Sequence, residues 1–161
     1  MHIKFSIVMV VILLISLSSC KDASKGDLEQ LQALNDSIKK TYAPDKRVAV
    51  YDISLSSELG EIVLRGETDQ EEALASLIEK LTGKGKKIQN LTRILPDSSV
   101  GDWNYAVVNN SVANIRSAPK HSGELATQAI LGTSLKVLKI VGDFYLVQTP
   151  DGYISWVDHG G

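Results

Sequence analysis

The hydrophobic periodicity of this sequence changes once, close to Pro96. Before that point, some segments repeat apolar residues at the spacing of a helix, and others alternate apolar and polar residues as a strand does. After it, only short alternating segments follow, separated by turn-forming residues at 109–110, 142–143 and 150–152. The change predicts an α+β chain in which a small mixed domain precedes an all-β domain.

The first domain is expected at residues 27–96, with the element order α-β-β-α-β. Leu28, Leu31 and Leu34 mark the apolar stripe of its first helix. Thr68 or Asp69 is expected to cap its second helix. The expected elements are a helix at 27–41, strands at 47–55 and 61–67, a helix at 69–81 and a strand at 87–95.

The second domain is expected at residues 103–158, after a polar linker at 97–102. Short strands separated by Asn, Asp and Gly residues are typical of a small β-barrel. Trp103 is expected to lie between the two domains. The expected strands are at 105–108, 112–116, 134–141, 144–149 and 152–157.

The N-terminus has the plan of an export signal. His2 and Lys4 precede an apolar run at 5–17. The run is shorter than the roughly 20 apolar residues that a helix needs to cross a bilayer. It ends in Leu17-Ser18-Ser19-Cys20, which resembles the lipobox of bacterial lipoproteins.

The lipobox resemblance implies a signal peptide at 1–19 and a lipid on Cys20. A short polar tether at 20–26 would then connect the lipid to the folded part. The protein is therefore expected in the cell envelope, held at a membrane surface. An ordinary signal peptide and an uncleaved anchor are the alternatives.

The first domain also carries a family resemblance. Residues 60–68 read GEIVLRGET, and an acidic helix and a short strand are expected after them. This order resembles the BON domain of bacterial envelope proteins, in which a strand ending in Leu, any residue and Gly leads into a helix. The resemblance implies a binding or adaptor role, without catalytic residues.

The second domain resembles bacterial SH3 (SH3b) domains in several motifs that occur in the expected order. Residues 112–119, VANIRSAP, are similar to the opening motif, and 127–132 are similar to the strand after the long loop. Residues 137–147 and 151–157 are similar to the later motifs, although Ser155 replaces the usual glycine. The matching segments read VANIRSAP, TQAILG, VL with GDFYLV, and DGYISWV.

The sequence of residues 122–128 resembles that of the SH3b domain that precedes the catalytic domain of NlpC/P60 cell-wall cysteine peptidases. That catalytic domain has no counterpart here. Cys20 is the single cysteine, and the lipobox assigns it to a lipid. A Cys-His nucleophile needs both side chains in one pocket, and the histidines are His2, His121 and His159. The chain as given is therefore not expected to be an enzyme, and 159–161 is interpreted as a truncated tail.

Four residues are candidates for ligand binding. The resemblance suggests that Arg116 contacts a ligand or pairs with a nearby acid or carbonyl. It also suggests that Glu124, in the long loop, holds the free amine of a wall peptide, with a solvated glutamate as the alternative. Tyr105 and Trp156 are large amphipathic side chains of the type that lines shallow grooves, and Trp156 has barrel filling as its alternative.

Composition excludes other classes of partner. The chain has 17 Lys and Arg against 19 Asp and Glu residues, a formal net charge of −2 at pH 7. Nucleic-acid binding calls for a clustered basic surface, so nucleic acid is not an expected partner. The sequence has neither metal-ligand spacing nor a glycine-rich phosphate loop, so no metal or cofactor is expected.

The leading functional hypothesis is a membrane-tethered cell-envelope binding module. Its SH3b domain would contact the peptidoglycan stem peptide or shape the entrance of a missing NlpC/P60 domain. One alternative is a fragment of a γ-D-glutamyl-L-diamino acid endopeptidase. Another is a lipoprotein that binds a second envelope protein.

Overall fold

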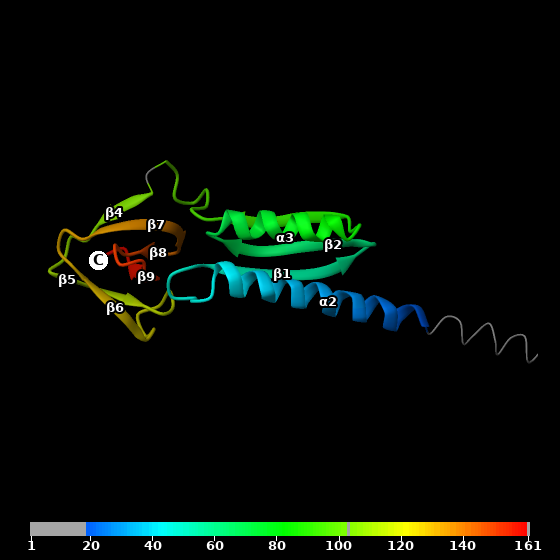
Figure 1. Ribbon diagram of the computed structural model, residues 1–161. Coiled ribbons are helices and arrows are strands. Elements are labelled where there is room, and N and C mark those ends of the chain that lie inside the picture. Colours follow the sequence, from blue (N-terminus) through cyan, green and yellow to red (C-terminus); the bar gives the residue numbers. More distant parts are fainter. Residues whose placement is uncertain (1–18, 103, 161) are drawn as a thin grey trace, which may run out of the picture.

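The computed structural model describes residues 19–102 and 104–160, with side chains described from residue 26 onward. The described chain is an α+β structure in which a helix-and-sheet unit is followed by a barrel of strands (Figure 1). The predicted order α-β-β-α-β of the first unit is observed. Its elements are α2 (Ser19–Tyr42), β1 (Tyr51–Glu58), β2 (Glu61–Thr68), α3 (Glu71–Gly83) and β3 (Ile88–Ile94).

The first unit has two layers. Its sheet has the order β1-β2-β3, with β1 antiparallel and β3 parallel to β2. Helix α3 makes the crossover that a parallel pair requires. Both helices pack on one sheet face, and the other face is polar, with Arg65 and Glu58 paired at 2.5 Å. The buried core between the layers includes Leu31, Ile38, Tyr51, Ile53, Leu64, Leu74, Leu77 and Leu81.

Helix α2 begins at Ser19 and therefore includes residues 20–26, which the sequence analysis interpreted as a tether. Lys, Asp, Ala and Ser are compatible with a helix, and only Gly26 is a poor helix former in this stretch. Contact with the core begins at Leu28. The predicted signal residues 1–18 lie outside the described part of the chain. None of the described helices is long and apolar enough to cross a membrane.

Strand β1 begins at Tyr51, so the prediction of a strand from residue 47 is wrong for its first residues. The Asp45 carboxylate accepts hydrogen bonds from the Arg47 backbone amide (2.9 Å) and guanidinium (2.6 Å), which fixes a turn there. The Arg47 side chain lowers the pKa of Asp45 to about 2. This local pairing replaces the strand ladder at residues 45–48.

The predicted cap of α3 is also wrong, because the N-cap residue is Gln70 and its side chain makes no capping bond. Thr68 and Asp69 bond to the segment before β1 instead. The Thr68 hydroxyl donates to the Val50 carbonyl (2.7 Å), and the Asp69 carboxylate accepts from the Val50 amide (2.7 Å). These contacts hold the start of α3 against β1.

Gly66 occupies a position in β2 that no other residue fits. Its φ is +123°, in the region that favours glycine. A Cβ atom at this position would lie 1.7 Å from the Asp52 carbonyl oxygen of the neighbouring strand. The Leu-any-Gly pattern noted in the sequence therefore reflects a close approach between β1 and β2.

The second unit is a six-stranded sheet in the order β4-β7-β8-β9-β5-β6. The sequence pattern missed one strand, β6, because its apolar residues do not alternate cleanly, although the family resemblance placed a strand within 127–132. Trp103, predicted to lie between the domains, is outside the described residues. The strands are β4 (Tyr105–Val107), β5 (Val112–Arg116), β6 (Leu125–Ile130), β7 (Ser134–Val141), β8 (Phe144–Gln148) and β9 (Ile154–Asp158).

An apolar cluster joins the two units. Val50 and Leu95 from the first unit pack with barrel residues, and Leu138 is 1% exposed. Two backbone bonds cross the same boundary, from the Ile154 amide to the Arg47 carbonyl (2.6 Å) and from the Asp97 amide to the Leu138 carbonyl (2.9 Å). This interdomain cluster consists of Val50, Leu95, Leu138, Leu146, Ile154 and Trp156.

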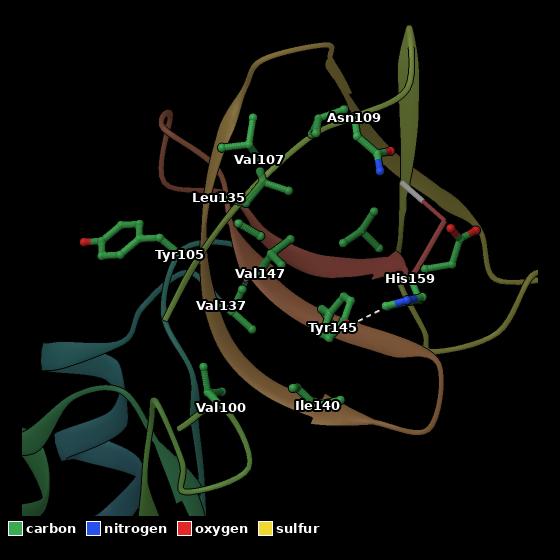
Figure 2. Close-up of a pocket in the computed structure, with 14 residues that line it drawn as sticks. Val100, Tyr105, Val107, Asn109, Leu135, Val137, Ile140, Tyr145, Val147 and His159 are labelled. Atoms are coloured by element: carbon green, nitrogen blue, oxygen red, sulfur yellow. Dashed lines mark hydrogen bonds between the residues drawn. The ribbon is translucent and has the colours of Figure 1, made fainter. Parts of the chain in front are cut away.

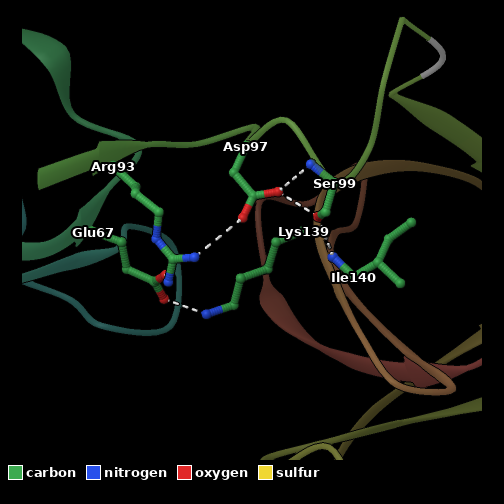
Figure 3. Close-up of polar contacts among 6 residues, drawn as sticks. All are labelled: Glu67, Arg93, Asp97, Ser99, Lys139 and Ile140. Atoms are coloured by element: carbon green, nitrogen blue, oxygen red, sulfur yellow. Dashed lines mark hydrogen bonds and ion pairs between the residues drawn. The ribbon is translucent and has the colours of Figure 1, made fainter.

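Polar contacts also join the two units (Figure 3). Lys139 of β7 forms an ion pair with Glu67 of β2, and both side chains are nearly buried, at 14% and 15% exposure. Arg93 lies 3.3 Å from the other Glu67 oxygen. The Ser99 hydroxyl accepts a bond from the Ile140 amide (3.0 Å). Part of the predicted linker 97–102 is therefore bonded to the barrel.

Candidate ligand-binding sites on the barrel

An apolar cavity of about 320 Å³ opens on one side of the barrel (Figure 2). Small-molecule sites span roughly 300–1,000 Å³, so this cavity suits a small group or one large side chain. Its floor is formed by residues of the barrel core. Its apolar lining includes Val100, Leu135, Val137, Ile140, Val147 and Val157.

The cavity has a polar end. There the Tyr145 hydroxyl and His159 Nδ1 are 2.5 Å apart (Figure 2). Asp158 lines the same end, and its carboxylate is 3.7 Å from His121 Nδ1. Among the described lining residues, Asp158 is the single carboxylate, and none is Lys or Arg. The lining therefore favours a neutral or cationic ligand over an anion.

A second, polar groove of about 260 Å³ runs between β6 and the turn at 149–151. The Thr149 hydroxyl donates a hydrogen bond to the Asp151 carboxylate, and this bond lowers the pKa of Asp151. Asp151 is therefore an anion at neutral pH, positioned to accept a bond from an amine or amide. The groove is lined by Thr127, Gln128, Ala129, Ile130, Thr133, Thr149, Pro150 and Asp151.

The predicted site residues do not form a single site. Tyr105 lines the apolar cavity and is 66% exposed, with its ring directed outward in Figure 2. Arg116 is partly buried, and its guanidinium donates to the Gly123 carbonyl (3.0 Å), which corresponds to the loop-fixing alternative. The Ser155 hydroxyl, in place of the usual glycine, donates to the Arg116 carbonyl (2.8 Å).

Trp156 and Glu124 lie apart from both hollows. Trp156 packs on the interdomain cluster, and the Lys139 ammonium nitrogen is 5.3 Å from its ring centroid. Glu124 is exposed, and its carbonyl accepts a bond from the Ser117 amide (2.9 Å). The structure therefore pairs Arg116 with Trp156 across β5 and β9, and it places Glu124 beside the Arg116–Ser117 backbone. Tyr105 lies apart from these three residues, at the apolar cavity.

Apart from Tyr105, sequence reasoning missed the residues that line the two hollows. Nothing in the sequence places Tyr145 beside His159. Asp151 was interpreted only as a turn residue. Both features depend on segments that become neighbours when the barrel closes, and a single sequence does not reveal such pairs.

The described residues contain no group of three potential metal ligands.

Residues 115–160 match the family model described as the bacterial dipeptidyl-peptidase Sh3 domain. These residues form a bacterial SH3 domain. The match runs from within β5 to the end of the described barrel, and both the polar groove and the polar end of the apolar cavity lie inside it. No curated protein matches the chain. The predicted SH3 domain is confirmed, whereas the BON resemblance of residues 27–96 lies outside the match and stays a prediction.

Proposed function

We propose that the protein is a membrane-tethered binding module of the bacterial cell envelope. In this proposal, its SH3 domain binds the stem peptide of peptidoglycan in the polar groove beside β6. The observation that carries the proposal is the position of this groove on a bacterial SH3 domain of a type named after peptidases.

The chemistry of the groove supports this ligand. A stem peptide has small side chains together with amines, amides and carboxylates. The groove offers hydroxyl groups on three threonines, the amide of Gln128 and the ionised Asp151. Asp151 is the group expected to accept the amine of the peptide, because charge-assisted bonds are the stronger ones.

The test compares two carboxylates of the same domain. Asp151→Asn is expected to weaken stem-peptide binding about tenfold in calorimetry, corresponding to about 1.4 kcal/mol. Asp143→Asn, at an exposed turn outside the groove, is the matched control and is expected to retain affinity. Equal affinities of the two variants, or a protein that stays in the supernatant when mixed with purified peptidoglycan, would contradict the proposal.

The long-loop residue Glu124 gives a separate measurement. Its carboxylate is exposed just before β6, so it is available to a peptide that extends beyond the groove. Glu124→Ala is expected to weaken binding of a peptide with a free N-terminal L-alanine. Unchanged affinity would identify Glu124 as a solvated surface residue.

The membrane tether rests on Cys20. In the proposal Cys20 carries a lipid, and each buried methylene adds about 0.8 kcal/mol to membrane binding. Cys20→Ala is expected to release the protein into the soluble fraction. Retention of this variant in the membrane would point to an uncleaved anchor.

A second candidate function follows from the peptidase in the family's name. In that case the SH3 domain would shape the substrate entrance of an NlpC/P60 catalytic domain encoded further along the gene. An in-frame continuation beyond Gly161 with Cys and His motifs would support this candidate. A stop codon at that position would contradict it.

A further inference from the structure

Strand β4 is one edge of the barrel sheet, and its outer side is unpaired among the described strands. The Asn104 carbonyl accepts a bond from the Val137 amide (2.8 Å), and the Val108 amide donates to the Thr133 carbonyl (3.0 Å). Bonded and non-bonded residues alternate along an antiparallel pair. The backbone groups of Tyr105 and Val107 therefore face away from β7.

The side chains of this edge are also exposed. Tyr105 is 66% exposed and Val107 is 63% exposed. Natural sheets protect an exposed edge by keeping the strand short, or with charged residues, proline or a covering segment. Strand β4 is short, but its side chains add no further protection. The three residues of β4, Tyr-Ala-Val, include neither a charge nor a proline. This edge has the features of a template for an added strand.

The apolar cavity lies beside the same edge. All three β4 residues and the following Val108 and Asn109 line it. A strand placed along β4 would therefore run past the mouth of the cavity, where alternate side chains of that strand reach different faces of the sheet. The free backbone groups and the cavity are thus available to one ligand.

We infer that the β4 edge and the apolar cavity together bind an extended segment of a partner protein, which adds to the sheet as a strand. Its backbone bonds to Tyr105 and Val107, and one large apolar side chain fills the cavity. Strand addition of this type combines main-chain bonds for affinity with a side-chain pocket for specificity. This inference is independent of the stem-peptide proposal, which concerns the groove beside β6.

Two observations favour a protein segment over a wall peptide. The cavity is apolar except at one end, whereas stem peptides carry small or charged side chains and D-residues that do not continue a regular strand. Asp158 is the one carboxylate among the described lining residues, and none of them is Lys or Arg. The segment is therefore expected to carry Lys or Arg within a few residues of its apolar residue.

The probe is a series of fluorescent peptides, acetyl-Lys-Thr-Val-X-Val-Thr-Lys-amide, in which X is Gly, Leu or Phe. Fluorescence anisotropy with the full-length protein in detergent is expected to show at least tenfold tighter binding for Leu or Phe than for Gly. Hydrogen exchange of the Tyr105 and Val107 amides is expected to slow when the peptide binds. N-methylation of alternate peptide bonds, which removes strand donors but keeps the side chains, is expected to abolish both effects.

The matched variants are Val107→Asp and Leu131→Asp. Both native side chains are 63% exposed, but Leu131 lies outside β4 and the cavity. Only Val107→Asp is expected to lose peptide binding. The inference is overturned if no peptide binds at millimolar concentration, if both variants bind equally, or if the N-methylated peptide binds as well as its parent. Tight binding of stem peptide to the cavity, or self-association of the protein through β4, would also overturn it.

Discussion

The ion pair between Glu67 and Lys139 crosses the boundary between the two units. Glu67→Ala would leave the nearly buried Lys139 without its carboxylate partner, although its ammonium group would still lie over the Trp156 ring. The same change would remove the bond between Arg93 and Glu67. Lys139→Ala would leave Glu67 paired with Arg93. The two variants are therefore expected to lower the free energy of unfolding by different amounts.

The structure sets the size of the effect. Removing one partner of a fully buried pair costs about 3–5 kcal/mol, and exposed pairs contribute about 0–1 kcal/mol. With exposures of 14% and 15%, Glu67→Ala is expected to lower the free energy of unfolding by about 3 kcal/mol and Lys139→Ala by about 2 kcal/mol. The coupling energy in a double-mutant cycle is expected to be about 1–2 kcal/mol.

Urea denaturation of the four proteins in the cycle measures these energies. The exposed pair of Arg65 and Glu58, at 47% and 46% exposure, is the control, and its coupling is expected to stay within about 0.5 kcal/mol. If the effects of Glu67→Ala and Lys139→Ala add without coupling, the ion pair does not hold the units together. The interdomain cluster alone would then account for their association.

Three further predictions concern the first unit. Burial raises the pKa of Tyr51 to about 12 from 10.0, so the unfolded chain ionises first. The stabilisation that the neutral Tyr51 side chain provides is intact below pH 10 and is lost between pH 10 and 12, which lowers the free energy of unfolding by about 2–3 kcal/mol. Tyr51→Phe is expected to lack this loss when unfolding is measured at both pH values. Gly66→Ala should cost at least about 3 kcal/mol or prevent folding, seen by circular dichroism, because its Cβ would overlap Asp52. Leu77→Ala, at 0% exposure, should cost about 2–5 kcal/mol in thermal unfolding.

Sequence patterns predicted the parts of the fold that depend on local periodicity. The stripe of Leu28, Leu31 and Leu34 predicted the first helix, and those leucines face the core. The helix nevertheless extends back to Ser19, beyond the predicted start at residue 27. The prediction of a strand from residue 47 was wrong because the bonds between Asp45 and Arg47 form a turn there. The alternation of apolar residues gives no sign of these polar bonds. Strand β6 was missed because an edge strand is only partly buried and so loses the alternating pattern.

The candidate sites were less predictable than the fold. Tyr105 was identified from its size and amphipathic character, and it lines a cavity. The pairing of Tyr145 with His159 depends on β8 lying beside β9, and the groove at Asp151 depends on β6 approaching a distant turn. The size and amphipathic character of Trp156 suit a groove, yet it packs in the interdomain cluster. Such placements follow from tertiary pairing, which one sequence does not display.

The continuity of α2 has a mechanical consequence. At 1.5 Å per residue, its 24 residues form a rod of about 36 Å, and the barrel lies beyond the end opposite Ser19 (Figure 1). With a lipid on Cys20, this helix would set the distance of both barrel sites from the membrane, and so the layer of the envelope that these sites can reach. Adding one helical turn, about 5.4 Å, before Asp27 would shift that layer and keep both the ion pair of Asp27 with Lys86 and the core contacts that begin at Leu28.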